Sequence, residues 1–235
     1  MSIFTNLTNS VLPSTISGLI LWLRADSLGL SNGAAVEEWY DESPAGSNAT
    51  QTGTACPLYI ANAVNSLPVV RFDGVNDNMP LDSTVTTMRH YFIVAKWSGA
   101  NNLTSILGRT TTPVMIYGGT TATGLIIHQG NSYSQVVNGT AYNNGVLLGS
   151  TAELYRDFNQ FQIFNVTTTL NGMLVDDIGG ILSNNYYFGG DVAEIIIYSS
   201  ILTEDNRLLV QNYLSRKYNI PTGTGYTPMT NVAKT

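Results

Sequence analysis

Four oxygen-bearing side chains follow an apolar run in the stretch PVVRFDGVNDNM, residues 68–79. Asp73 and Asp77 lie four positions apart, with Asn76 and Asn78 beside them. Carboxylate and amide oxygens in a tight loop suit calcium, although this spacing is not that of an EF-hand. An Asp-Gly dipeptide also forms turns, because Gly adopts positive φ freely. The stretch therefore favours a turn, with a calcium site at Asp73, Asn76 and Asp77 as the alternative and calcium as the one candidate cofactor.

We expect no catalytic residues in this chain. Two catalytic carboxylates need opposed environments across a cleft, which adjacent turn residues rarely provide. Glucanases on β-sandwiches carry a Glu-x-Asp-x-x-Glu pattern, whose alternation points the acids into one groove. The segment DVAEIIIYSS instead places Ile196 and Ser199 at those positions after Glu194. Glu194 is therefore expected to be a strand residue with a structural partner such as an arginine.

The other titratable candidates have simpler interpretations. Asp176 and Asp177 are expected at a solvated turn or strand end, with a cation ligand as the alternative. His90 and His128 lie in or beside apolar strands, without a second histidine at metal spacing, and are expected to be packing or surface residues. Cys56 is the single cysteine, so an intrachain disulfide is excluded and a small buried side chain is predicted.

The tryptophans divide into two groups. Trp22 and Trp39 are expected in the core. Trp97, together with Tyr91, is compatible with either the core or an aromatic platform for a sugar, and the sequence leaves both open.

Composition excludes several classes of partner. Only 11% of the residues are charged and the formal net charge is −6. The ten basic residues are scattered singly apart from Arg216-Lys217, so we expect no nucleic acid partner. The apolar runs at 18–23 and 194–198 are far shorter than the roughly 20 residues that span a bilayer, so no membrane insertion is expected. The first 16 residues lack the pattern of a secretory signal, which predicts that the chain is made in a cytoplasm and either stays there or leaves by lysis.

The elements that must position these residues are mostly short strands. β-Branched and aromatic runs of four to eight residues, separated by Asn-Gly and Asp-Gly turns, predict a sandwich or barrel. The predicted strands lie at 19–25, 68–72, 91–97, 105–108, 114–117, 124–129, 146–149, 161–167 and 191–198.

One segment, 201–221, predicts a helix instead. Thr203 can cap it, acidic residues occupy its first turn and basic residues its last turn, and Pro221 stops it. Leu209, Tyr213 and Leu214 are expected on its packed face. The polar, Thr/Asn/Gly-rich ends predict an N-terminal arm at 1–16 and a C-terminal tail at 221–235, around a single domain at 17–220.

The ordered blocks of this chain resemble the laminin-G-like, concanavalin-A-like jelly-roll family. The blocks are GLILWLRAD (18–26), VEEWYDES (36–43), PLY (57–59), LPVVRFDGVND (67–77), YFIVAKW (91–97), GGDVAEIIIYSS (189–200) and LTEDNRLLVQNYLSRKYNI (202–220). The resemblance implies an all-β, two-sheet antiparallel jelly-roll sandwich with one C-terminal helix. Residues 98–160 match no block, and ligand-selecting loops often lie in such a stretch.

Modules of this family generally bind or adhere, often to glycans and sometimes with calcium, and occur in bacterial and phage surface proteins. Together with the weakly charged surface, the arms and the missing signal, the resemblance predicts a non-enzymatic virion surface protein that is made in the host cytoplasm and leaves by lysis. A phage decoration, head-fibre or tail component would adhere or stabilise the shell, with other virion proteins, copies of itself and cell-surface glycans as partners. The alternative is a carbohydrate-binding adhesion module of a bacterial surface system, and a glycoside hydrolase lacks its acid pair.

Overall fold

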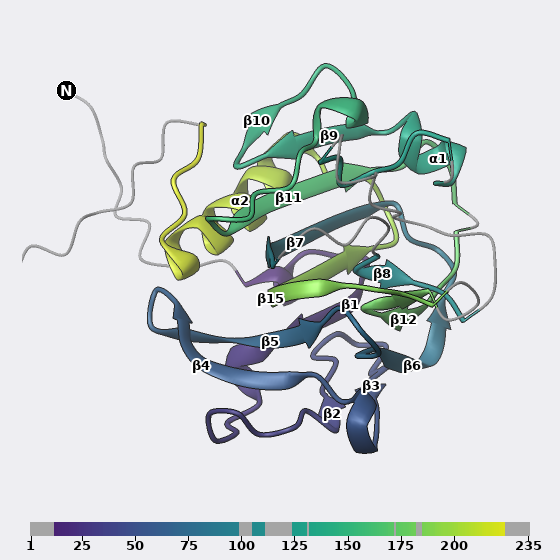
Figure 1. The fold of residues 1–235 in the computed structure, drawn as a ribbon. Helices are drawn as coiled ribbons and strands as arrows, with labels where there is room; N and C mark the ends of the chain where they lie inside the picture. Colours follow the sequence, from purple (N-terminus) through teal and green to yellow (C-terminus); the bar gives the residue numbers. More distant parts are fainter. Residues whose placement is uncertain are drawn as a thin grey trace, which may run out of the picture.

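The protein is built mainly from antiparallel β-sheets with a helix at its C-terminal end (Figure 1). The computed structural model describes residues 12–98, 105–110, 124–130, 132–171, 173–181 and 185–223. Within these ranges the strands form one sheet of eight strands, one of five and one of two. All pairs of named strands within them are antiparallel, which confirms the predicted all-β class and sheet type.

The larger sheet has the order β10-β9-β11-β7-β15-β5-β4, and β1 also pairs with β15. Its strands are β1 (Leu19–Arg24), β4 (Leu58–Val64), β5 (Leu67–Asp73), β7 (His90–Trp97), β9 (Thr140–Asn143), β10 (Val146–Leu147), β11 (Gln162–Thr167) and β15 (Gly189–Tyr198). Along one side, β15 pairs with β7. Along its other side, the first half of β15 pairs with β5 and the second half pairs with β1. Every residue of β15 is buried, which agrees with the apolar run Ile195–Ile197 in its second half.

The smaller sheet has the order β2-β3-β6-β12-β8. Its strands are β2 (Glu38–Trp39), β3 (Ala49–Thr50), β6 (Met79–Val85), β8 (Leu107–Gly108) and β12 (Val175–Ile178), and a separate pair consists of β13 (Gly180–Ile181) and β14 (Tyr186–Tyr187). Short helical turns connect the strands at η1 (Pro13–Thr15), η2 (Ala25–Ser27), η3 (Gly53–Ala55), α1 (Ser134–Val137) and η4 (Thr151–Glu153).

Two hydrophobic cores lie on opposite faces of the larger sheet. Alternation along β7 divides its side chains between them, since successive residues of a strand point to opposite faces. Tyr91, Ile93 and Ala95 lie in the core that the two sheets share. Phe92 and Val94 lie in a second core, which includes residues of the C-terminal helix. The larger sheet is thus covered on both sides.

The C-terminal helix α2 (Glu204–Tyr218) forms as predicted. The Thr203 hydroxyl accepts a hydrogen bond from the Asn206 backbone at 3.3 Å and caps the first turn. The prediction for its packed face was partly wrong, because Leu209 is exposed and Val210 is buried in its place. None of the helices within the described ranges has the length and apolar character needed to cross a bilayer.

Most of the long predicted strands are confirmed, and several short ones are not. The structure places strands at five of the predicted ranges, namely 19–25, 68–72, 91–97, 161–167 and 191–198. The range 124–129 forms no strand, since Leu125 makes only an isolated bridge with Tyr155. The ranges 105–108 and 146–149 shorten to β8 and β10, and the range 114–117 lies outside the described residues.

The predicted arm and tail are described only where they adjoin the domain. Pro13 and Ile16 are buried, and the Tyr198 hydroxyl donates to the Pro13 carbonyl at 3.1 Å. At the other end, the Gly223 backbone N–H donates to the Asn144 carbonyl at 2.9 Å. Residues 1–11 and 224–235 lie outside the described residues, so the boundaries of the arm and tail stay predictions.

Candidate functional site

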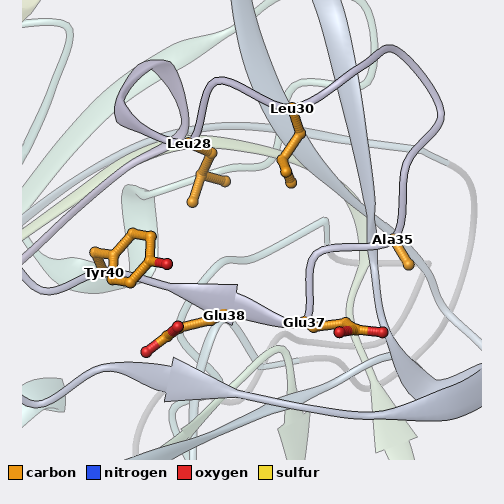
Figure 2. A pocket seen from close by; sticks show the side chains of 6 residues that line it. All are labelled: Leu28, Leu30, Ala35, Glu37, Glu38 and Tyr40. Atoms are coloured by element: carbon orange, nitrogen blue, oxygen red, sulfur yellow. The ribbon is translucent and has the colours of Figure 1, made fainter.

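A surface cleft opens between the loop that follows η2 and strand β2 (Figure 2). It encloses about 300 Å³. Six residues line it, namely Leu28, Leu30, Ala35, Glu37, Glu38 and Tyr40. The Tyr40 side chain is 49% exposed, and the lining combines apolar, aromatic and acidic groups. Such a mixture suits a ligand with apolar faces and polar edges.

Local sequence explains why these side chains point outward. Val36 and Trp39 are fully buried, so the residues between and after them face solvent. The Val36 backbone N–H donates to the Pro57 carbonyl at 2.8 Å, and the Tyr59 N–H donates to the Ala34 carbonyl at 2.8 Å. Gly33 turns the chain with a φ of 82°. These contacts fix the wall of the cleft to strand β4.

The acidic side of the cleft is positioned by a chain of hydrogen bonds. Asn48 donates through Nδ2 to Glu38 Oε1 at 2.8 Å, and its Oδ1 accepts from the Asp41 backbone at 3.0 Å. The Asp41 carboxylate in turn accepts from the backbone N–H of Trp22 at 2.8 Å. Hydrogen bonding to Glu38 and the charge of Glu38 raise the pKa of the Tyr40 hydroxyl. Glu38 and Tyr40 therefore form a coupled pair on the cleft surface.

The predicted calcium loop is a hydrogen-bonded turn. Asp73 Oδ1 accepts from the backbone N–H groups of Val75 at 2.8 Å and Asn76 at 3.2 Å. Asp77 Oδ2 accepts from the Asp73 N–H at 2.8 Å. Burial, opposed by this hydrogen bond, raises the pKa of Asp77 to about 6. These carboxylate oxygens support the turn interpretation.

No metal cluster accompanies that turn in the part of the chain that the structure describes. There, no group of three or more His, Cys, Asp or Glu side chains could hold a metal ion. The Asn76 amide donates to the Thr54 carbonyl at 3.0 Å, and Asn78 is buried. Calcium binding at Asp73, Asn76 and Asp77 stays a prediction.

The expectation of a solvated pair at Asp176 and Asp177 was wrong for the second residue. Asp177 lies in β12 and is fully buried, where Asn78 Nδ2 donates to its Oδ2 at 2.6 Å. Burial raises the pKa of Asp177 to about 7, because the charged form loses hydration. Asp176 is half-buried and accepts from the Thr110 backbone at 2.6 Å. The strand turns one acid inward and leaves its neighbour at the surface.

Glu194 has a structural partner as expected, but this partner is a lysine. Lys217 Nζ lies 2.7 Å from Glu194 Oε2 and 2.8 Å from Asp26 Oδ1. Trp22 Nε1 donates to Glu194 Oε1 at 2.6 Å, and the Tyr218 hydroxyl donates to Glu194 Oε2 at 2.7 Å. Glu194 is fully buried and joins β1, β15 and α2. This network stabilises the fold and is closed to a substrate.

Most of the remaining candidates are core residues, whereas His128 is half-buried. Trp97 and Tyr91 are buried, so neither offers a platform to a sugar, and Trp22 and Trp39 are buried as predicted. Cys56 is buried, as expected. His90 is also buried, and burial lowers its pKa to about 4 while its Nε2 lies 3.2 Å from the Asn165 amide oxygen.

Sequence reasoning did not identify the cleft residues as a candidate site. The block VEEWYDES, residues 36–43, contributed only to the family resemblance. Two exposed glutamates lie between buried Val36 and Trp39, and exposed Tyr40 follows, which indicates an exposed acidic and aromatic edge. The loop that supplies the two leucines is brought to that edge by tertiary contacts, for which the sequence carries no periodic signal.

No model of a known protein family matches the chain, and a search among curated proteins found no significant relative.

Proposed function

We propose that this protein is a non-enzymatic attachment module on the surface of a virus particle, built as a laminin-G-like, concanavalin-A-like jelly roll. The ordered sequence blocks and the two antiparallel sheets that share a core support this assignment. The weakly charged composition, rich in Asn and Thr, suits a particle surface. The role is adhesion or stabilisation of the shell, with other virion proteins and copies of itself as neighbours.

The observation that carries the attachment role is the cleft of Figure 2. An exposed Tyr40 lies beside Leu28 and Leu30, and carboxylates form the polar edge. Aromatic and apolar side chains stack on the CH faces of sugars, whereas carboxylates accept hydrogen bonds from hydroxyl groups. A glycan is therefore the ligand that fits the lining best.

The proposal that the protein is not an enzyme rests on the partners and positions of its acidic side chains. Glu194 is occupied by Lys217, and Asp191 accepts two hydrogen bonds from Arg71 at 2.6 and 2.9 Å. The exposed Glu37 and Glu38 lie on one wall of the cleft, side by side in the chain. A hydrolase of this type would need two acids with opposed environments across the bond to be cleaved.

A panel of immobilised glycans tests the attachment role with the full chain, in calcium and in chelator. We expect binding that falls at least about tenfold in Tyr40→Ala. Tyr155→Ala is the matched control, because Tyr155 is 53% exposed and does not line the cleft. Equal binding by the wild type and Tyr40→Ala, or no binding to any glycan, would overturn the assignment of the cleft.

The alternative is a carbohydrate-binding adhesion module of a bacterial surface system, which the same cleft supports. Mass spectrometry of purified virus particles separates the two. Recovery of the chain in stoichiometric amounts with the particle supports the virion role. Its absence from particles, together with retained glycan binding, would favour the bacterial module.

A further inference from the structure

The cleft carries negative charge that no cation within the described residues neutralises. Its lining includes Glu37 and Glu38 but no lysine, arginine or histidine. Neither glutamate forms an ion pair with a described residue, whereas the neighbouring Glu42 is paired with Arg24 at 2.7 Å. Lys217 is likewise held by Glu194. The cleft therefore presents two carboxylates without an ion-pair partner among the described residues, and Glu38 is held by hydrogen bonds from Asn48 and Tyr40.

We propose that the cleft selects an amine-bearing glycan, with separate free ammonium groups of its amino sugars placed against Glu37 and Glu38, whose carboxylates point to different sides in Figure 2. The proposal rests on the attachment function above and names its ligand class. A cation gains from carboxylates at short range and from an aromatic ring face, which Tyr40 offers. Acidic sugars such as uronic or sialic acids are repelled by the same charges.

The apolar residues of the cleft determine which chemical groups the ligand needs besides its amine. Leu28, Leu30 and Ala35 line the cleft with the polar groups, as Figure 2 shows. A sugar ring presents CH groups on its faces and polar groups at its edge, so it can contact both kinds of side chain at once. A simple metal cation would leave the leucines without a contact. The mixed lining thus favours an amino sugar over a bare ion.

The Glu38 side chain is held in place before a ligand binds. Asn48 donates to Glu38 Oε1, and Glu38 pairs with Thr50 in the β2–β3 register. The side chain is thereby held in a preferred direction before a ligand arrives, which lowers the entropy lost on binding. Glu37 lies outside this hydrogen bond and remains available to a second polar group of the ligand.

Calorimetry with three tetrasaccharides tests the proposal on the full chain. The probes are a β-1,4-linked glucosamine tetramer, its N-acetylated counterpart and tetragalacturonic acid, at a slightly acidic pH that keeps the amine charged. We expect the free amine to bind about tenfold or more tightly than the other two. High salt should weaken its binding, because exposed charges are screened.

Variants assign the selectivity to the two glutamates. The double variant Glu37→Gln, Glu38→Gln should lose about tenfold in affinity for the glucosamine tetramer and keep its weaker affinity for the N-acetylated one. Asp205→Asn, an exposed acid in the first turn of α2, is the control with one charge removed outside the cleft. Because these side chains are exposed, all variants should retain the wild-type melting temperature.

The outcomes separate the two proposals. Equal binding of the free and acetylated tetramers, lost in Tyr40→Ala, would overturn the amine selectivity and leave the attachment function intact. Binding of no tetramer would overturn the amine selectivity and leave the attachment function to the glycan panel, whereas binding unaffected by Tyr40→Ala would overturn both. Amine selectivity that survives the double glutamine variant would contradict the role of Glu37 and Glu38.

Discussion

Asp177 is a buried acid whose protonation state should influence folding. Its pKa is raised from 3.8 to about 7 by burial, whereas the unfolded chain leaves it near the ordinary value. Its contribution to stability is therefore present at low pH and is lost as pH rises from about 4 through about 7. The loss is on the order of 4 kcal/mol at higher pH.

The variant Asp177→Asn isolates this effect. Its amide oxygen can still accept from Asn78 Nδ2, and it carries no charge at any pH. We expect the difference in unfolding free energy between variant and wild type to shift in favour of the variant between pH 4 and pH 8. Urea unfolding across this range measures it. A constant difference would show that Asp177 is ionised without penalty.

The comparison between variant and wild type is needed because other groups titrate in the same range. Asp77 has a raised pKa of about 6 and acts in the same direction. His90 acts oppositely, since its pKa is lowered to about 4 and stability is lost as pH falls below 6.5. The matched control is Asp82→Asn, because Asp82 is exposed.

Glu194 should be among the most costly acids to remove. Glu194→Ala leaves the half-buried Lys217 with Asp26 as its one remaining described carboxylate partner and removes the acceptor of the buried Trp22 Nε1. We expect a loss of about 3 to 5 kcal/mol in unfolding free energy. Glu38→Ala, an exposed strand glutamate, should change it by less than about 0.5 kcal/mol. Similar losses for the two variants would argue against the buried network.

Sequence reasoning at the residue scale succeeded where hydrophobicity decides. Trp22, Trp39 and Cys56 are buried because apolar side chains leave water. It failed where a polar residue is buried, because burial of Asp177 and the partner of Glu194 depend on contacts far apart in the chain. Asn78 and Asp177 are separated by 99 positions.

At the scale of elements, the Thr203 cap offers a direct test of helix α2. Thr203→Ala removes the acceptor of the Asn206 N–H and should cost about 1 kcal/mol of stability. Thr169→Ala is the control, since the Thr169 side chain is exposed and caps no helix. Thermal unfolding of both variants measures the difference. Equal melting temperatures would mean that the cap contributes nothing.

Two strands, β6 and β4, were not predicted from the sequence, and each has a feature that explains why. β6 contains Pro80, and a proline within a run argues against a strand, although here it pairs opposite Asp177. β4 contains Asn62, whose φ of 55° interrupts the alternation, and its register with β5 shifts after Ile60. The helix was predictable because capping, charge and periodicity agree over 15 residues.

At the scale of the whole molecule, the start of the described chain is packed against the sandwich. Deleting residues 1–11 should leave the melting temperature nearly unchanged. Deleting residues 1–16 should lower it, because Ile16 leaves the core beneath α2 and Tyr198 loses its acceptor at Pro13. Calorimetric scans of the two truncations make the comparison. An equal melting temperature for both would contradict the packing of this segment.

Self-association is a further prediction at this scale. The virion role predicts a homo-oligomer that depends on the N-terminal arm, because such arms commonly become ordered against neighbouring subunits. Light scattering of the full chain and of the chain without residues 1–11 measures the mass. A monomer in both cases would contradict assembly through the arm. It would not bear on attachment through the cleft, which the glycan-binding experiments test.

The cleft itself shows why function is harder to predict than fold. The class of fold follows from repeated short strands and one capped helix. The cleft depends on how the loop at 28–37 is held against residues 57–59, through backbone hydrogen bonds with Pro57 and Tyr59. Such contacts join segments that no local pattern connects.

A nuclear magnetic resonance titration of the full, isotope-labelled chain with the glucosamine tetramer tests directly whether the cleft binds an amino glycan. If the cleft is the binding site, the chemical shifts of the backbone amides of residues 28–40 and of Asn48, which holds Glu38, should change on titration. Changes confined to another surface, or none at saturating ligand, would contradict binding of an amino glycan there.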